Sequence, residues 1–132
     1  MRSLKALPAD IDLLKLQGAA LQAFFNLSKA WGLNTEEEQV LLGHPPRSTF
    51  FKWKKEKQGH LSCDILDRIS YLLGIYKALH ILLPNERAAN EWPKKPNSAP
   101  LFNGCSALDK MLTGKLIDLA DVRRYLDAER GG

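Results

Sequence analysis

The sequence predicts an all-α protein in which a helix-turn-helix lobe is joined by a long helix to a small helical C-terminal lobe. Three observations lead to this fold class. Apolar residues recur at intervals of three and four along most of the 132-residue chain, which is the period of an amphipathic helix. Segments containing glycine and proline separate these stretches, and strand signals are absent. With 45% hydrophobic residues, the chain can form a core without disulfides or metals.

The first predicted helix covers residues 19–31 and is followed by a glycine that can end it. Its apolar side chains have helical spacing, at Leu21, Phe24, Phe25, Leu27 and Trp31. Gly32 suits the left-handed conformation that terminates many helices. A second, short helix is predicted at residues 36–42, because Thr35 and Glu38 have the spacing of a capping box. Its acidic first turn is favourable to the helix dipole, and Gly43 stops it.

A third helix is predicted after the segment His-Pro-Pro at residues 44–46, because proline lacks the amide donor that a helix needs. It begins near residue 47 and runs to about residue 57. Phe50 and Trp53, with Phe51 as a further candidate, are expected to face the core, and the basic residues to face outward. Two short helices separated by such a turn have the outline of a helix-turn-helix.

A central helix is predicted at residues 62–83, the longest apolar-periodic stretch of the chain. It joins both halves of the protein, and Gly74 lies within it as a candidate bend. Pro84 ends it, and Asn85 caps a short helix that reaches about residue 92.

The C-terminal part is expected to contain two more helices after an irregular connector. These helices are predicted at residues 106–112, where Ser106 is the cap, and at residues 118–128. Cys63 and Cys105 are the two cysteines of the chain and show no short-range pairing pattern. We therefore expect both thiols to be reduced and to serve as small core residues.

The elements divide the chain into three predicted parts: an N-terminal segment at 1–17, a helix-turn-helix domain with the bridging helix at 18–84, and a C-terminal domain at 85–132. The first part has no uninterrupted apolar run, which argues against a signal peptide, and no 18-residue apolar stretch occurs anywhere. We therefore expect a cytoplasmic protein without a membrane partner. Apolar residues of the first part suit a homodimer contact: Leu4, Leu7, Ile11, Leu14 and Leu16.

The net charge of +4 is concentrated in residues 44–60, which contain five Lys and Arg residues against Glu56 alone. Clustered positive charge indicates an anionic partner. On the second helix of a helix-turn-helix, the N-terminal residues face base edges in the major groove and lysines meet phosphates. The predicted base contacts are Arg47, Ser48 and Thr49, and the predicted phosphate contacts are Lys52, Lys54, Lys55 and Lys57. A solvated surface helix is the alternative interpretation.

A succession of short motifs over residues 89–132 is the most informative pattern in the chain. It reads A-A-N-E-W-P-K-K-P-N, then L-F-N-G-C-S-A-L-D-K-M-L-T-G-K, then V-R-R-Y-L-D-A-E-R-G-G. In its order and spacing, this pattern resembles the toxin-binding domain of the Xre/MbcA/ParS antitoxin family, whose partners are RES-domain toxins. The residues that carry the resemblance are Trp92, Pro96, Asn97, Phe102, Ala107, Leu108, Asp109, Gly114, Val122, Arg123, Tyr125, Leu126 and Asp127.

The resemblance implies an antitoxin that binds its toxin through residues 85–132 and represses its own operon through residues 35–60. RES-domain toxins act on NAD, so the implied mechanism is that the last helix and the tail cover the toxin's active-site entrance. The implied contacts are Trp92, Asn97, Phe102, Asp109, Arg123, Tyr125 and Arg130, and residues 130–132 are expected to form a flexible reaching tail. Core packing is the alternative role for Trp92, and helix capping for Asp109.

An enzyme is not expected, because no glycine-rich phosphate loop, nucleophile elbow or paired-carboxylate motif occurs. His60 and Cys63 alone have metal-ligand spacing, so we predict no catalytic residue, metal or cofactor. Two other functions remain open: a stand-alone helix-turn-helix regulator whose C-terminal half only dimerises, and an interaction module without DNA binding. The antitoxin is favoured because the pattern at 89–132 exceeds what a dimerisation region needs.

Overall fold

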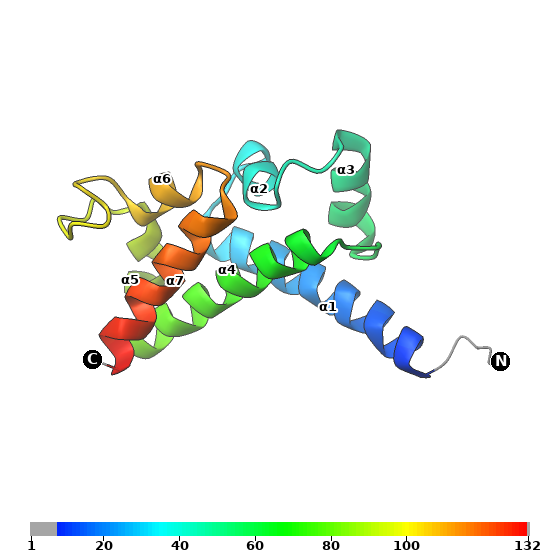
Figure 1. Cartoon of the computed structure of the whole chain (residues 1–132), viewed down its shortest axis with the longest axis horizontal. Helices are drawn as coiled ribbons and strands as arrows, with labels where there is room; N and C mark the ends of the chain where they lie inside the picture. Colours follow the sequence, from blue (N-terminus) through cyan, green and yellow to red (C-terminus); the bar gives the residue numbers. More distant parts are fainter. Residues whose placement is uncertain (1–7, 132) are drawn as a thin grey trace.

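Seven α-helices and one short 3-10 helix make up the computed structural model, which describes residues 8–131 (Figure 1). Within that range there is no β-strand, and one isolated β-bridge pairs Pro96 with Ser106. The all-α fold class is therefore confirmed. Leu4 and Leu7, two residues of the predicted dimer contact, lie outside the described residues.

A long helix, α4 (Cys63–Leu82), connects the two halves of the molecule (Figure 1). It packs against α1 (Pro8–Trp31) on the N-terminal side and along α7 (Leu116–Gly131) on the C-terminal side. One continuous cluster of buried apolar side chains extends from Phe24 in α1 to Leu126 in α7. The two lobes therefore share one core, and α4 belongs to both.

Helix α1 begins eleven residues before the predicted start at residue 19, at Pro8. The prediction followed the buried stripe, which starts near Leu21, whereas the preceding turns are helical but exposed at Leu13, Leu14 and Leu16. Proline is tolerated in the first turn of a helix, where its missing amide has no partner in any case. The predicted division between residues 17 and 18 thus falls inside α1.

The capping box of α2 (Thr35–Leu41) lies one residue earlier than predicted. Asn34, not Thr35, accepts a hydrogen bond from the backbone amide of Glu37 at 2.8 Å, and the Glu37 carboxylate accepts one from the amide of Asn34 at 2.9 Å. The Thr35–Glu38 box was therefore wrong. Asparagine is at least as good a cap as threonine, and this shift leaves Glu38 free to turn into the core.

Helix α3 (Arg47–Glu56) has the predicted start and buries Phe50 and Trp53 as expected. Phe51, the third candidate for the core, is instead 40% exposed, which corrects that expectation. Gly59, in the loop after α3, makes room for Trp53, because a Cβ atom there would lie 2.2 Å from the indole Nε1. One side of α3 therefore packs on the core, and the other side is exposed to solvent.

The remaining helices are α5 (Glu86–Glu91), the 3-10 helix η1 (Trp92–Lys94), α6 (Ala107–Met111) and α7. Ser62, Asn85 and Ser106 cap α4, α5 and α6 through their side chains. Helix α7 continues to Gly131, so Arg130 and Gly131 do not form the flexible tail that the sequence predicted. Helix α4 also continues through Gly74 without a break.

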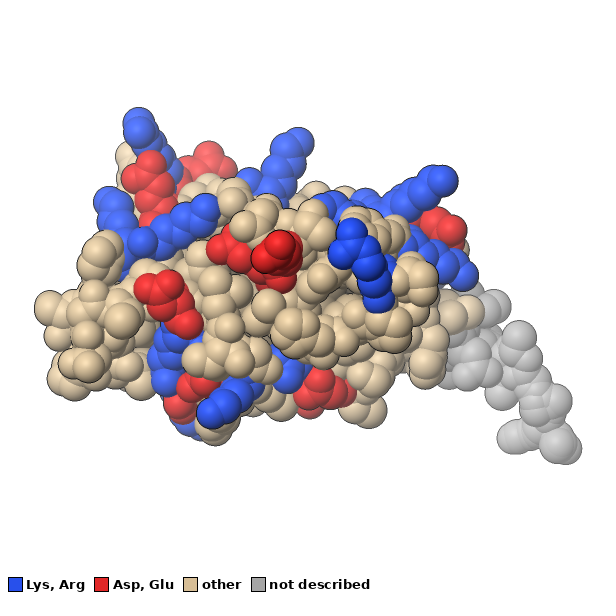
Figure 2. Space-filling model, turned by 90° about the horizontal axis from the view of Figure 1, so that it is seen from above, with Lys and Arg blue, Asp and Glu red and all other residues tan. Residues whose placement is uncertain are grey.

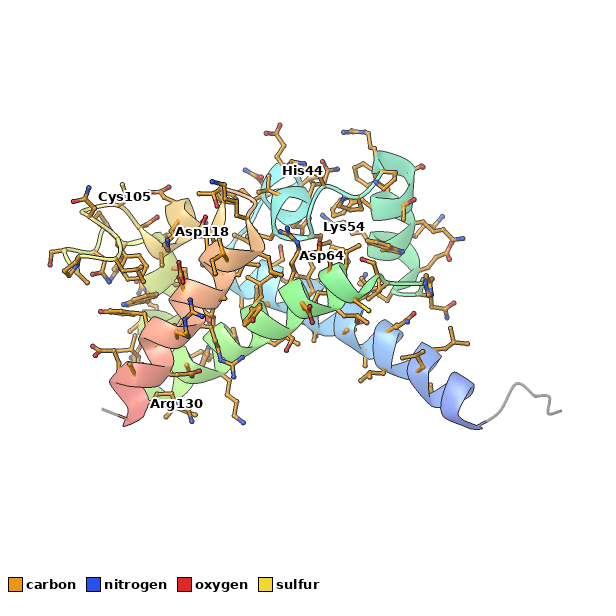
Figure 3. All side chains as sticks on the ribbon, in the orientation of Figure 1. His44, Lys54, Asp64, Cys105, Asp118 and Arg130 are labelled. Carbon is orange, nitrogen blue, oxygen red and sulfur yellow. The ribbon has the colours of Figure 1, made fainter. Side chains whose placement is uncertain are left out.

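The cysteines are not core residues, contrary to the sequence prediction. Cys63 at the start of α4 is exposed. Cys105, in the loop before α6, is exposed as well (Figure 3). No helix among residues 8–131 is long and apolar enough to cross a membrane.

Candidate functional site

The exposed face of α3 carries most of the side chains that were predicted to contact DNA. Arg47, Ser48, Lys52 and Lys55 are exposed, and Thr49 is half-buried. Within residues 8–131, the cations Arg47, Lys52 and Lys55 take part in no ion pair. Figure 2 looks down on this side of the molecule and shows Lys and Arg side chains standing out from the end where α3 lies. These charges are available to an external anion.

Lys54 lies at the edge of this exposed face of α3, where its side chain is 40% exposed, and it has an internal partner (Figure 3). Its Nζ is 2.6 Å from a carboxylate oxygen of Glu38, whose side chain is only 5% exposed. The Ser28 hydroxyl donates to the other oxygen of Glu38 at 2.5 Å. The ammonium group also lies about 6 Å from two core rings, those of Phe25 and Phe50. Lys54 therefore fastens α3 to α1 and α2, a role that the charge pattern did not suggest, and its predicted phosphate contact stays a prediction.

Lys57 is also directed at the protein rather than away from it. It has the left-handed conformation that ends α3, with φ of 55°, and its Nζ donates to the carbonyl of Lys54. The same atom lies 5.2 Å from the centre of the Phe25 ring. A cation in this place interacts favourably with the negative end of the helix.

The N-terminal end of α3 has free backbone donors and one residue that sequence reasoning missed. Pro46 occupies the cap position and offers no side-chain acceptor to the first turn. Such amides readily bind phosphate oxygens. One turn further along the helix the Phe51 ring is exposed, with the Arg47 guanidinium 5.0 Å from its centre. Because Phe51 belongs to the apolar pattern of α3, the sequence contained no signal for this exposure.

Three aromatic side chains from distant segments meet in the C-terminal lobe. Phe102 packs edge-to-face against Trp92 of η1 at 5.8 Å and against Tyr125 of α7 at 5.1 Å. Phe102 itself is 3% exposed, whereas Trp92 and Tyr125 remain half-buried. Phe102 thus supports the two outer rings from beneath and offers almost no surface of its own.

Asn97 and Asp109 organise the backbone between η1 and α6. The Asn97 side chain accepts a hydrogen bond from the amide of Ala99 at 2.8 Å, and its backbone bonds to Cys105 and Gly104. Asp109 forms a capping box with Ser106, in which each side chain accepts a bond from the other's amide at 3.0–3.1 Å. Helix capping, the alternative role for Asp109, is therefore observed.

Arg123 and Arg130 of α7 lie on either side of Asp127. Arg123 is 3.1 Å from the Asp127 carboxylate and Arg130 is 3.8 Å from it. Arg123 also lies directly over Gly74 of α4, where a Cβ atom would be 1.8 Å from its Nη1. Gly74 thus allows a close approach of α7 to α4. With the exposed Ile81, these three charged side chains line a shallow depression near the end of α7.

An apolar groove lies beside Trp92 and Tyr125 and was not predicted. It is formed where the end of α4 meets η1 and α7, and its other lining residues are Leu79, Leu82, Leu83, Leu126 and Glu129. The leucines belong to helical stripes that the sequence assigned to the core. Only the crossing of α4 and α7 reveals that some of their surface faces outward. Two aromatic rings and one carboxylate at an apolar groove are typical of a protein-binding surface.

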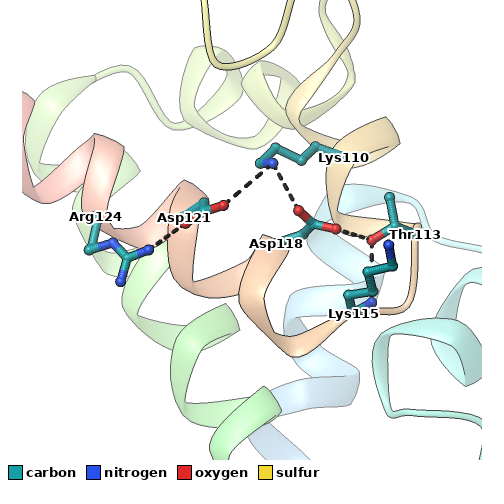
Figure 4. Close-up of polar contacts among 6 residues, drawn as sticks. All are labelled: Lys110, Thr113, Lys115, Asp118, Asp121 and Arg124. Atoms are coloured by element: carbon teal, nitrogen blue, oxygen red, sulfur yellow. Dashed lines mark hydrogen bonds and ion pairs between the residues drawn. The ribbon is translucent and has the colours of Figure 1, made fainter.

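A polar network fixes α6 against the start of α7 (Figure 4). Lys110 Nζ lies 2.8 Å from Asp118 and 3.6 Å from Asp121, while the Thr113 hydroxyl donates to Asp118. The hydrogen bond from Lys110, followed by that from Thr113, lowers the pKa of Asp118 below its ordinary value. The same bond to Asp118 raises the pKa of Lys110. The network therefore stabilises both charged forms.

We expect Asp118→Asn to lower the free energy of unfolding at pH 7 by about 1–2 kcal/mol, because Lys110 loses its closest charged partner. The pKa of Asp118 is lower in the folded state, so its contribution is present above the unfolded pKa of about 3.9 and is lost as the pH falls through the folded value. The pKa of Lys110 is raised in the folded state, so the contribution of Lys110 to stability is lost only as the pH rises through the folded-state pKa of Lys110. Urea unfolding at pH 7 and below pH 4 measures the first effect.

The matched control for this variant is Asp67→Asn, which alters an exposed carboxylate of α4 that forms no ion pair within the described residues. It should leave the stability nearly unchanged at both pH values. A difference between wild type and Asp118→Asn that stayed constant under acid conditions would contradict the ionic role of Asp118.

Comparison with known proteins identifies the two lobes. Residues 11–74 match the antitoxin Xre-like helix-turn-helix domain, and residues 78–132 match the antitoxin Xre/MbcA/ParS C-terminal toxin-binding domain. The chain is also similar to the uncharacterized protein y4oB of Sinorhizobium fredii (strain NBRC 101917 / NGR234), with 49% identity over 114 residues, or 86% of either chain. Both matched domains are non-enzymatic, and they meet within α4. The chain therefore belongs to the Xre/MbcA/ParS family of antitoxins.

Proposed function

We propose that this antitoxin neutralises a RES-domain toxin by covering the entrance to its NAD site, and that it represses its own operon through α3. The observation that carries the first part is the apolar groove with Trp92 and Tyr125 inside the toxin-binding domain. The resemblance of residues 89–132 to partners of RES-domain toxins supports the identity of the toxin.

The groove offers what a tight protein contact needs. Buried aromatic anchors contribute most of the energy of such interfaces, and a polar rim excludes water around them. Trp92 and Tyr125 supply the anchors, and Glu129 supplies a charge at the edge. Arg123 and Arg130 place positive charge beside the groove, on the same helix. A toxin segment held there would leave α7 across the substrate entrance, so inhibition requires no chemistry from the antitoxin.

The second part of the proposal rests on the free cations of α3. Arg47, Lys52 and Lys55 project from one face, next to uncapped amides at the helix start. This arrangement suits a recognition helix that enters the major groove while its flanks contact phosphates. Binding that depends on phosphate contacts falls steeply with salt, which distinguishes an antitoxin that represses from one that only binds toxin.

Both partners can bind at the same time in this arrangement. Helix α3 and the C-terminal end of α7 lie toward opposite ends of the molecule (Figure 1). The proposed homodimer gains support from the exposed Leu13, Leu14 and Leu16, which form apolar surface on the projecting part of α1. A dimer would present two copies of α3 to two half-sites of an operator.

Co-expression with a cognate RES-domain toxin tests the proposed function. We expect the toxin alone to arrest growth and deplete cellular NAD, and the antitoxin to restore both and to co-purify with the toxin. A toxin that stays active in the presence of the folded chain would reject this function. In that case the stand-alone regulator, whose C-terminal half only dimerises, becomes the better account.

Arg130→Glu is expected to weaken toxin binding about ten-fold, because it reverses a charge at the edge of the proposed contact surface. Arg124→Glu is the matched control on the same helix, since six residues of separation direct the two side chains to different faces. Titration calorimetry with purified toxin gives both dissociation constants. An equal loss for both variants, or none for Arg130→Glu, would place the contact elsewhere.

A further inference from the structure

Phe51 is an exposed apolar side chain in the middle of a basic surface. Among residues 47–56, all of which the structure describes, it is the one large apolar side chain that is not buried. Its exposed fraction is 40%, against 0% for the neighbouring Phe50. Single exposed apolar residues are common on proteins, so exposure alone indicates nothing. The surroundings of this ring are what make it informative.

The ring is held in place from two sides. Phe50 packs against it edge-to-face with the ring centres 5.2 Å apart, and Phe50 is anchored in the core. The Arg47 guanidinium lies over the ring at 5.0 Å from its centre. Because Arg47 precedes Phe51 by four residues, both lie on the same face of the helix. An aromatic ring that is already ordered loses little conformational entropy when it contacts a ligand.

The face that presents Phe51 is the one proposed to enter the major groove. Ser48, Lys52 and Lys55 are exposed beside it and follow the same helical stripes. The edges of bases in the major groove are polar except for the C5 methyl group of thymine. A fixed phenyl ring cannot form hydrogen bonds with the polar groups, whereas it can bury that methyl group against its face or edge.

We propose that Phe51 contacts the C5 methyl group of a thymine and thereby makes this antitoxin specific for a T·A pair at one position of each half-site. The inference rests on the proposed DNA-binding function of α3. Cytosine at that position would remove the methyl group and place an amino donor against the ring. Arg47 then contacts a guanine one or two base pairs away, because side chains four residues apart on a helix are separated by about 5–6 Å and successive bases by about 3.4 Å.

Deoxyuridine tests this contact, since it differs from thymidine only by the missing methyl group. Duplexes that bind the wild-type chain are first selected from a random library, and each thymine of the selected site is then replaced singly by deoxyuridine. Fluorescence anisotropy at one fixed salt concentration gives the dissociation constants. At one thymine per half-site we expect about four-fold weaker binding by the wild type, the effect of one buried methyl-sized group. Phe51→Ala should bind both duplexes equally.

Two control measurements separate the possible failures. Lys55→Met should weaken binding to the thymine and the deoxyuridine duplex by the same factor, because it removes only a phosphate contact. If the folded chain selects no duplex and shows no salt-dependent DNA binding, the proposed repression fails and this inference with it. If duplexes bind but no thymine shows a methyl effect, or Phe51→Ala retains it, only the role of Phe51 is overturned. Loss of toxin neutralisation or of dimerisation in Phe51→Ala, with an unchanged response to the methyl group, would assign the ring to a protein contact.

Discussion

Replacing Phe50 with alanine is expected to lower the free energy of unfolding by about 4 kcal/mol, the largest effect that we predict for a single substitution. The Phe50 side chain is fully buried and lies 6.0 Å, ring centre to ring centre, from Phe25 of α1. Its removal leaves a cavity where α3 packs on α1, and a small domain has only about 5–15 kcal/mol of stability in total. Urea or thermal unfolding followed by circular dichroism measures the loss.

Phe51→Ala is the control for this prediction, because it removes the same atoms from the adjacent position. Since Phe51 is 40% exposed, we expect a change of less than about 1 kcal/mol. The pair therefore tests the orientation of α3 on the core. Similar losses for both variants would mean that α3 is rotated about its axis relative to this structure.

Replacing Lys54 with methionine is expected to destabilise the fold by about 2 kcal/mol, because it leaves the buried carboxylate of Glu38 without its cation. The Lys54 side chain is 40% exposed and water can partly replace it, so the expected loss is below that for a fully buried pair. Glu38 would retain only the hydrogen bond from Ser28. Chemical unfolding at neutral pH gives the difference.

Two further variants show whether the effect has this cause. Glu38→Gln should cost less than Lys54→Met, because the amide can still accept the Ser28 bond while the freed ammonium group turns to water. Lys55→Met, one residue along α3, should leave stability unchanged and weaken DNA binding instead. If Lys54→Met weakened DNA binding without any loss of stability, the original assignment of Lys54 to a phosphate would be correct.

The sequence predicted the helices well where the buried apolar stripe and the glycine, proline and cap residues indicated the same helix ends. Glycine and proline marked the ends of α2, α3 and α4, and Asn85 and Ser106 were visible as caps because their side chains act locally. The errors arose where a helix extends beyond its buried stripe, as α1 does before Leu21. They arose also where two adjacent residues can both cap, as Asn34 and Thr35 can.

The roles of individual site residues depended on contacts between distant segments. Lys54 and Lys55 are identical in type and adjacent in sequence, yet only the position of Glu38, sixteen residues before Lys54, makes one of them structural. In the same way Phe102 belongs to the toxin-binding pattern but lies beneath Trp92 and Tyr125. The groove between α4, η1 and α7 could not be predicted, because it exists only where these elements cross.

Because α4 is one continuous helix, the relative orientation of the two binding faces depends on the number of residues in α4. Because the two matched regions meet inside one helix, a residue inserted there would rotate one lobe against the other by about 100° and move it by about 1.5 Å. The shared core could not follow such a rotation. Length differences among relatives should therefore accumulate in connections such as 57–62, and the helical phase of α4 should be the same in those relatives.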